Sequence, residues 1–274
     1  MYYDINSKKI VQIEESKSLK FLYNNIVGRL ILKIISIRFI SKICGLYLNS
    51  KLSKRKIKKF IKKNNINMDE YEDKNYSSFN DFFIRNIKDN KRKINDGLIA
   101  VSDAKLSVYE INKESSFKIK NSVYTIEELI QEKNTNYKYA CIFRLCVDDY
   151  HHYVFPDNGE FISQKYIKGR LHTVQPIAFK KYKVFTENSR CVSFLECDNL
   201  GKVCYIEVGA LVVGKIVNED KKCFKKGEEK GHFEFGGSTV VVLLEDKVKI
   251  DQILIDNTNK GIETIVKLGM SIGR

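Results

Sequence analysis

A serine that follows two glycines at the start of an apolar run is the residue with the clearest potential for chemistry. Residues 225–245 read KKGEEKGHFEFGGSTVVVLLE, which places Gly237 and Ser238 where a polar turn meets a predicted buried strand. Because glycine has no Cβ, the Ser238 hydroxyl can approach the Gly237 carbonyl closely. The same pattern is also typical of an ordinary hairpin turn that leads into a core strand, and spacing alone does not separate the two interpretations.

Four histidines are the candidates for acid–base chemistry: His151, His152, His172 and His232. The first two are adjacent in DDYHHYVFP (148–156), and an acid-rich turn after an apolar run suits a general acid or base. A histidine near a strand end is also often only structural. Neighbouring side chains on a strand project to opposite faces, so the adjacent pair is a poor metal site, and we expect no metal.

Composition and motifs exclude several classes. The chain has 274 residues, of which 43% are hydrophobic, so it can bury a sizeable core. Its seven cysteines contain no CxxC pair, which argues against a structural zinc site and against a disulfide framework. The sequence has no Walker A motif, no GxGxxG after a strand and no HExxH, so the corresponding phosphate, dinucleotide and zinc-protease sites are not expected.

The elements that must position these groups are mainly strands after about residue 98, where short runs of Val, Ile, Tyr and Phe alternate with turn residues. Short helices are predicted at Ser77–Lys88 and Thr125–Gln131, the second with Thr125 and Glu128 as a capping box. The fold class is therefore α+β, with basic amphipathic N-terminal helices before a mainly antiparallel β body. The predicted strands are Lys105–Ile111, Tyr139–Val147, Cys191–Cys197, Val203–Val208, Leu211–Val217, Ser238–Leu244 and Val248–Ile255.

The positive charge is concentrated at the front of the chain. Residues 1–66 hold 16 basic and 3 acidic residues, a net charge of +13 out of the total of +14. Ile26–Leu48 is apolar but carries four cations, each costing roughly 2.5–3.5 kcal/mol at the centre of a membrane span. Its polar stripe changes side near Ser36, which predicts two short amphipathic helices or one bent helix.

A polybasic run follows directly. Lys51–Lys63 holds eight cations, with Ser53 as a candidate helix cap and an apolar side of Ile57, Phe60 and Ile61. An apolar face beside such a run favours binding to an anionic membrane surface. A solvated helix packed on the body is the plainer alternative. A nucleic-acid partner is not expected, because no aromatic-interleaved Gly/Arg pattern or helix-turn-helix signature is present.

Nine segments, taken in order, resemble phosphatidylserine decarboxylase of the clostridial type. The last of them resembles the family's site of self-cleavage, where a Gly–Ser bond breaks and the serine becomes a pyruvoyl group. The segments are SKRKIKKFIKKNNI (53–66), FNDFFIRNIK (79–88), SDAKL (102–106), FKIKNSVYTIEELI (117–130), FRLCVDDYHHYVFPDNG (143–159), GRLHTVQP (169–176), FTENSR (185–190), YIEVGALVVGKI (205–216) and KGEEKGHFEFGGSTVVVL (226–243).

The resemblance implies a mechanism. Ser238 would attack the Gly237 carbonyl, and the chain would break into residues 1–237 and 238–274, the second capped by pyruvoyl. This covalent cofactor would form a Schiff base with phosphatidylserine, release CO2 and give phosphatidylethanolamine. Asp103 would orient a histidine base, as in a serine-protease triad.

The base itself is open between three histidines. Two departures from the family pattern bear on it: Val154 occupies the family's second histidine position, and Ala104 follows Asp103 where a glycine is common. His151 occupies the first histidine position and is preferred, both for self-cleavage and for protonating the substrate. His152 and His172 remain alternatives as the self-cleavage base.

The charge distribution and the resemblance together divide the chain into a membrane-association segment, residues 1–66, and a catalytic β-rich body, residues 67–274. The expected partners are phosphatidylserine in an anionic membrane and the two cleaved chains for one another, with a homodimer also considered. The expected location is peripheral, on the cytoplasmic face of the cell membrane. A non-catalytic basic protein that binds membranes peripherally is the alternative function.

Overall fold

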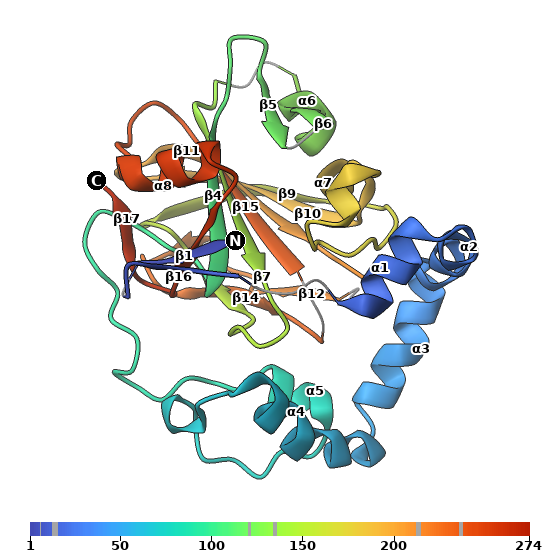
Figure 1. Cartoon of the computed structure of the whole chain (residues 1–274). Coiled ribbons are helices and arrows are strands. Elements are labelled where there is room, and N and C mark those ends of the chain that lie inside the picture. Colours follow the sequence, from blue (N-terminus) through green and yellow to red (C-terminus); the bar gives the residue numbers. More distant parts are fainter. Residues whose placement is uncertain (6, 13–15, 120–121, 134–135, 212–214, 236–237) are drawn as a thin grey trace.

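A ten-stranded sheet forms the centre of the molecule in the computed structural model, which describes residues 1–5, 7–12, 16–119, 122–133, 136–211, 215–235 and 238–274 (Figure 1). The strand order is β13-β9-β10-β11-β15-β7-β4-β16-β1-β2. Its described pairings are antiparallel, apart from the parallel pairing of β1 with β16. The strands are β1 Tyr2–Asp4, β2 Lys9–Val11, β4 Ala104–Glu110, β7 Tyr139–Leu145, β9 Gly159–Ile167, β10 Arg190–Cys197, β11 Gly201–Val208, β13 Cys223–Phe224, β15 Ser238–Leu244 and β16 Glu263–Val266.

Smaller sheets and helices cover both faces of this sheet. A three-stranded sheet has the order β12-β14-β8, and two pairs are formed by β17 with β3 and by β5 with β6. The bounds are β3 Leu98–Ile99, β5 Ser116–Ile119, β6 Ser122–Thr125, β8 His152–Val154, β12 Ile216–Asn218, β14 Glu229–Phe233, β17 Ser271–Gly273, α6 Ile126–Ile130, η3 Ala178–Lys180, α7 Val184–Glu187 and α8 Gln252–Asn259. The predicted α+β class with a mainly antiparallel body is confirmed.

Strand β15 is the central element of the core, and all seven of its residues are buried. Val240 and Val242 pack into one hydrophobic cluster with α8 and the three-stranded sheet. Val241 and Leu243 pack into a second cluster on the other face, with α6 and α7. A strand buried on both faces reads as a continuous apolar run, which is why the sequence identifies it so clearly.

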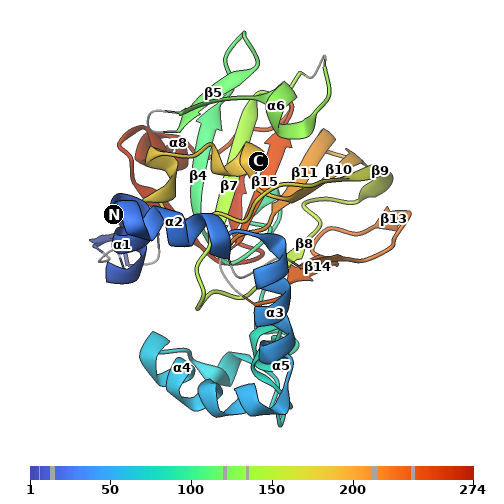
Figure 2. The ribbon, with the colours of Figure 1, turned by 90° about the vertical axis from the view of Figure 1, so that its right-hand side faces the viewer.

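The front segment folds into a chain of short helices along one side and below the sheet (Figures 1 and 2). The predicted change of direction near Ser36 is confirmed, because α2 ends at Ile35 and α3 begins at Arg38. No helix within the described ranges is long and apolar enough to span a membrane. The helices are α1 Lys17–Asn24, α2 Ile26–Ile35, α3 Arg38–Leu48, η1 Lys51–Lys56, α4 Ile57–Asn64, η2 Met68–Glu70 and α5 Phe79–Phe83.

Local signals predicted some helix starts correctly and one wrongly. The Ser78 and Thr125 hydroxyls accept the amides of Asp81 and Glu128, at 3.1 Å in both cases, and cap α5 and α6. Ser53 does not cap a helix: it lies inside η1, where its hydroxyl accepts the Phe79 amide at 2.8 Å. This contact ties the polybasic segment to the start of the body.

Three further expectations differ from the structure. Val248–Ile255 is not a strand, because α8 begins at Gln252 and packs Leu254 and Ile255 on the core. A short apolar run does not by itself separate a strand from a buried helix. In Leu211–Val217, residues 212–214 lie outside the described residues and β12 begins at Ile216. Residues 1–66 are not helical throughout, because β1 and β2 extend the main sheet.

Candidate active site

Ser238 is the first residue of β15 and pairs with Leu145, the last residue of β7. The side chain is completely buried, and its Oγ has no hydrogen-bond partner among the described residues. A buried hydroxyl left without a partner costs about 1–3 kcal/mol, so the position of Ser238 requires an explanation. The other half of the predicted scissile bond, Gly237, lies outside the described residues.

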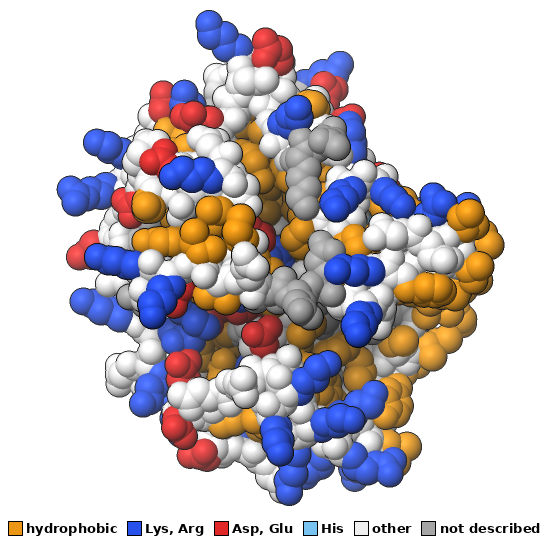
Figure 3. All heavy atoms as spheres, in the orientation of Figure 1, with side chains coloured by type: hydrophobic (Ala, Val, Ile, Leu, Met, Phe, Trp, Pro, Cys, Tyr) orange, Lys and Arg blue, Asp and Glu red, His pale blue; other side chains and the backbone are white. Residues whose placement is uncertain are grey.

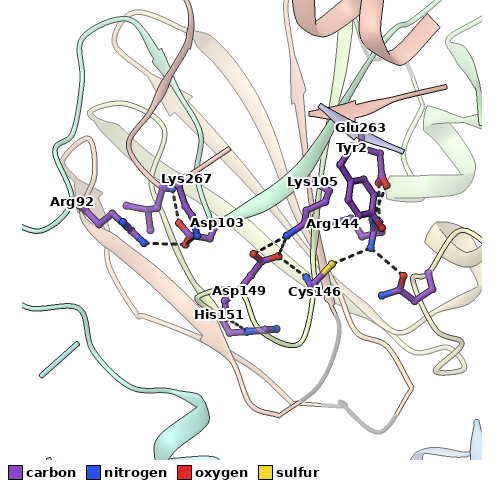
Figure 4. A network of polar contacts seen from close by, with 12 residues as sticks. Tyr2, Arg92, Asp103, Lys105, Arg144, Cys146, Asp149, His151, Glu263 and Lys267 are labelled. Carbon is purple, nitrogen blue, oxygen red and sulfur yellow. Dashed lines mark hydrogen bonds and ion pairs between the residues drawn. The ribbon is translucent and has the colours of Figure 1, made fainter. Parts of the chain in front are cut away.

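His151 lies in the turn that follows β7, so the strand that pairs with Ser238 also leads to the preferred histidine. Its Nδ1 is 2.8 Å from the carbonyl oxygen of Asp149 (Figure 4). Because a carbonyl oxygen only accepts hydrogen bonds, Nδ1 carries the proton, and in the neutral ring the lone pair is on Nε2. The His151 carbonyl in turn accepts the amide of Phe233 at 3.0 Å, which fixes the turn against the end of β14.

A buried ion pair holds this turn in place. The Asp149 carboxylate accepts Lys105 Nζ at 2.9 Å and the Cys146 amide at 2.8 Å (Figure 4). Burial alone would raise the pKa of Asp149, but the Lys105 ammonium and the two hydrogen bonds outweigh it, so the pKa lies below its usual value. Burial would likewise lower the pKa of Lys105, and Asp149 reverses that effect, so the pKa lies above its usual value.

A second ion pair, between Arg144 and Glu263, lies beside the pair of Lys105 and Asp149 on the same sheet. Arg144 is paired in register with Lys105 and with Thr239, the residue after Ser238. Its guanidinium binds Glu263 at 2.6 Å and the Tyr2 hydroxyl at 3.1 Å. Sequence reasoning assigned no role to Lys105 or Arg144. The signal that could have found them is a lone cation within an otherwise apolar strand, since buried charges require partners.

Asp103 is also buried, but its described partners are cations and an amide. The carboxylate binds Lys267 at 2.7 Å, Arg92 at 3.2 Å and the Leu268 amide at 2.8 Å (Figure 4). Val154, at the family's second histidine position, donates its amide to the nearby Val101 carbonyl at 2.9 Å. The predicted relay between Asp103 and a histidine therefore stays a prediction.

His172 lies near the opposite flank of β15, which runs between β11 and β7. Its ring stacks on Tyr182 with centroids 4.1 Å apart, and its backbone amide donates to Asn188 at 2.9 Å. Asn188 also donates to the carbonyl of Gly209, directly after β11, at 2.7 Å. Burial lowers the pKa of His172, which keeps this ring neutral to lower pH than an exposed histidine.

The remaining two histidines lie on the three-stranded sheet. His152 faces Tyr150 and the Ile84 carbonyl, whereas the His151 ring packs on Phe83, so the two neighbours have different surroundings. His232 is paired in register with His152 across β14 and β8. The structure therefore brings His152 and His232 together, whereas His151 lies in the turn after Leu145, the residue that pairs with Ser238.

An apolar groove of about 640 Å³ approaches the site from the helical front segment. Leu48 of α3, Phe60 of α4, Phe79 of α5 and Phe235 line it. Phe235 lies three residues before Ser238 in the chain. The Phe83 ring has its centroid 5.0 Å from Phe235 and 4.1 Å from the His151 ring, so one aromatic cluster connects the groove with the histidine.

The fold places a buried serine at the start of its central strand, next to the end of the strand that leads to His151. The sequence profile described as phosphatidylserine decarboxylase matches residues 79–274, so the chain belongs to the phosphatidylserine decarboxylase family. A phosphatidylserine decarboxylase proenzyme 2 of Clostridium acetobutylicum is 51% identical over 93% of this chain and 91% of the relative.

Two further relatives are similar over nearly the whole chain. A phosphatidylserine decarboxylase proenzyme of Clostridium kluyveri is 39% identical over 99% of this chain and 98% of its own length. A phosphatidylserine decarboxylase proenzyme of Desulfitobacterium hafniense is 37% identical over 99% of this chain and 97% of its own length. The family resemblance in the sequence is confirmed, and the word proenzyme in these names fits self-cleavage.

Proposed function

We propose that this chain is a phosphatidylserine decarboxylase that cleaves itself between Gly237 and Ser238 and makes a pyruvoyl group from Ser238. The observation that carries the proposal is the Ser238 hydroxyl, which is buried, begins the central strand and has no partner among the described residues. A serine in this position suits conversion into a pyruvoyl group, because the strand would hold the new group rigidly. Membership of the family supplies the reaction.

The proposed cleavage needs a base that removes the proton of the Ser238 hydroxyl. His151, held by Asp149 with its Nε2 as the basic nitrogen, removes the hydroxyl proton. Oγ attacks the Gly237 carbonyl, the amide becomes an ester, and β-elimination releases the Gly237 carboxylate. Dehydroalanine remains at position 238, and water converts it to pyruvoyl with loss of ammonia. His172, neutral and near the other flank of β15, and His152 remain the alternative bases.

The pyruvoyl carbonyl, once formed, would supply an electron sink for the electron pair that remains on the substrate carbon when CO2 leaves. The groove lined by Leu48, Phe60 and Phe235 suits the acyl chains of the lipid. Lys59 and Lys63 also line this groove and suit the lipid phosphate. His151, at the inner end of the aromatic cluster, then protonates the substrate carbon after CO2 has left.

Cleavage would leave the two chains associated. Strand β15 forms hydrogen bonds with β11 and β7, and both belong to the longer chain. Strand β16 of the shorter chain pairs with β4 and β1, and β17 pairs with β3. The 37 residues from 238 to 274 thus remain part of the core on three strands and α8. A homodimer stays a prediction.

The front segment supplies the contact with an anionic membrane. Large apolar side chains of α2 and α3 are exposed, from 40% for Ile31 to 70% for Ile26, and form a patch on the outer side of these helices (Figure 3). The eight cations of Lys51–Lys63 follow on η1 and α4. An apolar patch combined with a polybasic run gives insertion and electrostatic attraction together. A peripheral location on the cytoplasmic face of the cell membrane is also proposed.

A decarboxylase assay tests the proposal. The purified chain should convert phosphatidylserine in mixed vesicles to phosphatidylethanolamine, and Ser238→Ala should abolish the conversion. Ser107→Ala, at a buried serine on β4, serves as the control and should retain it. No conversion by the unmodified chain, or equal conversion by Ser238→Ala, would leave the non-catalytic membrane-binding alternative in its place.

A further inference from the structure

Three side chains of metal-ligating type converge where β8 meets β14, and neither Ser238 nor His151 is among them. His152 and His232 lie opposite each other in the antiparallel register, with ring centroids 5.0 Å apart. Glu229 Oε1 is 2.8 Å from His152 Nδ1 and 3.6 Å from His232 Nδ1. One ligand atom from each of the three residues lies within 4.8 Å of the other two.

A β-bulge makes this convergence possible. Glu229 and His232 are three residues apart, and in a regular strand such residues project to opposite faces. The register of β14 against β8 shifts between Glu229 and Gly231, so one extra residue is accommodated there. The bulge turns Glu229 to the same face as His232, which places a carboxylate beside two imidazoles.

The hydrogen bonding of His152 favours a cation between these groups. His152 Nε2 is 3.1 Å from the Ile84 carbonyl oxygen, so Nε2 carries a proton. The neutral ring then directs the Nδ1 lone pair at the Glu229 carboxylate, which is repulsive unless a positive charge lies between them. Metal-binding histidines characteristically donate their other N–H to a carbonyl or carboxylate in this way.

His232 provides a second, independent indication. Its Nδ1 is buried and has no hydrogen-bond partner within the described part of the chain. The atom points toward the carboxylate oxygen that His152 faces, but at 3.6 Å it is beyond hydrogen-bonding distance. Ligands of a tetrahedral zinc ion at about 2.0–2.1 Å from the metal lie roughly 3.3–3.5 Å apart, so small side-chain rotations would suffice.

We propose that His152, Glu229 and His232 form a binding site for a divalent transition-metal ion of the zinc type. Two imidazoles and one carboxylate select zinc over magnesium or calcium, which prefer ligand sets made of oxygen alone. Glu229 is the most exposed of the three, so a fourth position faces solvent. A metal bound here would link β8 to β14, while His152 Nε2 donates to the carbonyl of Ile84, the residue after α5. His152 would then be a metal ligand and no longer a candidate base for self-cleavage.

Zinc titration of the full chain tests the site. After treatment with EDTA and dialysis, calorimetry with ZnCl2 should show one high-affinity equivalent, and zinc should raise the melting temperature. His232→Ala and Glu229→Gln should each weaken this binding by tenfold or more. His172→Ala removes a buried histidine outside the cluster and should bind zinc normally. Cobalt(II) should give the visible absorption of a four-coordinate site, and His232→Ala should lose it.

The opposite results would overturn the proposal. Zinc binding that is absent, or equal in the unmodified chain and in His232→Ala, would show that His152 and Glu229 form an ordinary ion pair with a proton between them. Because His232 is partly exposed, His232→Ala should fold, and a circular-dichroism spectrum of the zinc-free variant verifies this. Zinc retained by His232→Ala through thiols such as the exposed Cys223 would also count against the site.

Discussion

The buried pair of Lys105 and Asp149 should be essential for stability, and Asp149→Asn isolates the contribution of the charge. The asparagine can still accept the Cys146 amide, but the Lys105 ammonium, 8% exposed as a side chain, is left without a counter-charge. Breaking a buried pair from one side costs about 3–5 kcal/mol. Lys105→Met in the same chain removes the isolated charge and should recover most of this free energy of unfolding.

Urea unfolding in the uncleavable Ser238→Ala background measures these effects on a single chain. Asp148→Asn, at the exposed neighbouring carboxylate, is the matched control and should change the free energy of unfolding by less than about 0.5 kcal/mol. A loss below about 1 kcal/mol for Asp149→Asn would refute the reasoning. So would a double variant as unstable as the single one, because the cost would then not arise from the isolated charge.

The pH dependence of stability gives a second measurement of the same pair. The pKa of Asp149 is lower in the folded chain than its ordinary value of 3.8. A lowered pKa contributes stability that is fully present above about pH 4 and is lost as pH falls through the folded value. Asp149→Asn should remove this part of the acid dependence, whereas Asp148→Asn should leave it unchanged.

Three other predictions concern the site and the membrane. His151→Ala should reduce decarboxylation about 10²-fold or more, the usual size of a general acid–base contribution, and a normal turnover number would assign the role to another histidine. Asp103→Asn should slow self-cleavage in a time course of the full-length chain, and unchanged processing would exclude Asp103 from the relay. Replacing Lys58, Lys59, Lys62 and Lys63 by Gln should weaken binding to anionic vesicles, measured by sedimentation, about a hundredfold or more, because each cation near the surface contributes about 1 kcal/mol. Equal binding of the unmodified chain to neutral and anionic vesicles would contradict the electrostatic account.

The parts of the fold that sequence reasoning predicted are those with strong local signals. The run from Ser238 to Leu244 has few alternatives to a central strand, because both of its faces are buried. The break near Ser36 follows from a polar stripe that changes side. The prediction of a strand at Val248–Ile255 was wrong. Part of this range belongs to α8, and its three consecutive apolar residues are compatible with either a strand or a buried helix.

The candidate site was predictable only in its individual residues. Ser238 and His151 could be selected from local context and family resemblance, but their placement depends on the pairing of β15 with β7. The partners of Asp149 and Asp103, Lys105 and Lys267, are 44 and 164 residues away along the chain, and no local pattern indicates them. We expected no metal because the adjacent histidines, His151 and His152, project to different sides. The proposed ligands instead come from two paired strands: His152 lies opposite His232, and a bulge brings Glu229 beside them.

The mass of the small fragment tests the central claim most directly. The purified full-length chain should yield a fragment of about 4 kDa from residues 238–274, lighter than the plain hydrolysis product by the mass of one ammonia, and hydrazine should label its N-terminus as a carbonyl. Ser238→Ala should give the intact chain of 31.9 kDa alone. A fragment that begins with an ordinary serine, or cleavage at the same bond in Ser238→Ala, would contradict the conversion of Ser238 into a pyruvoyl group.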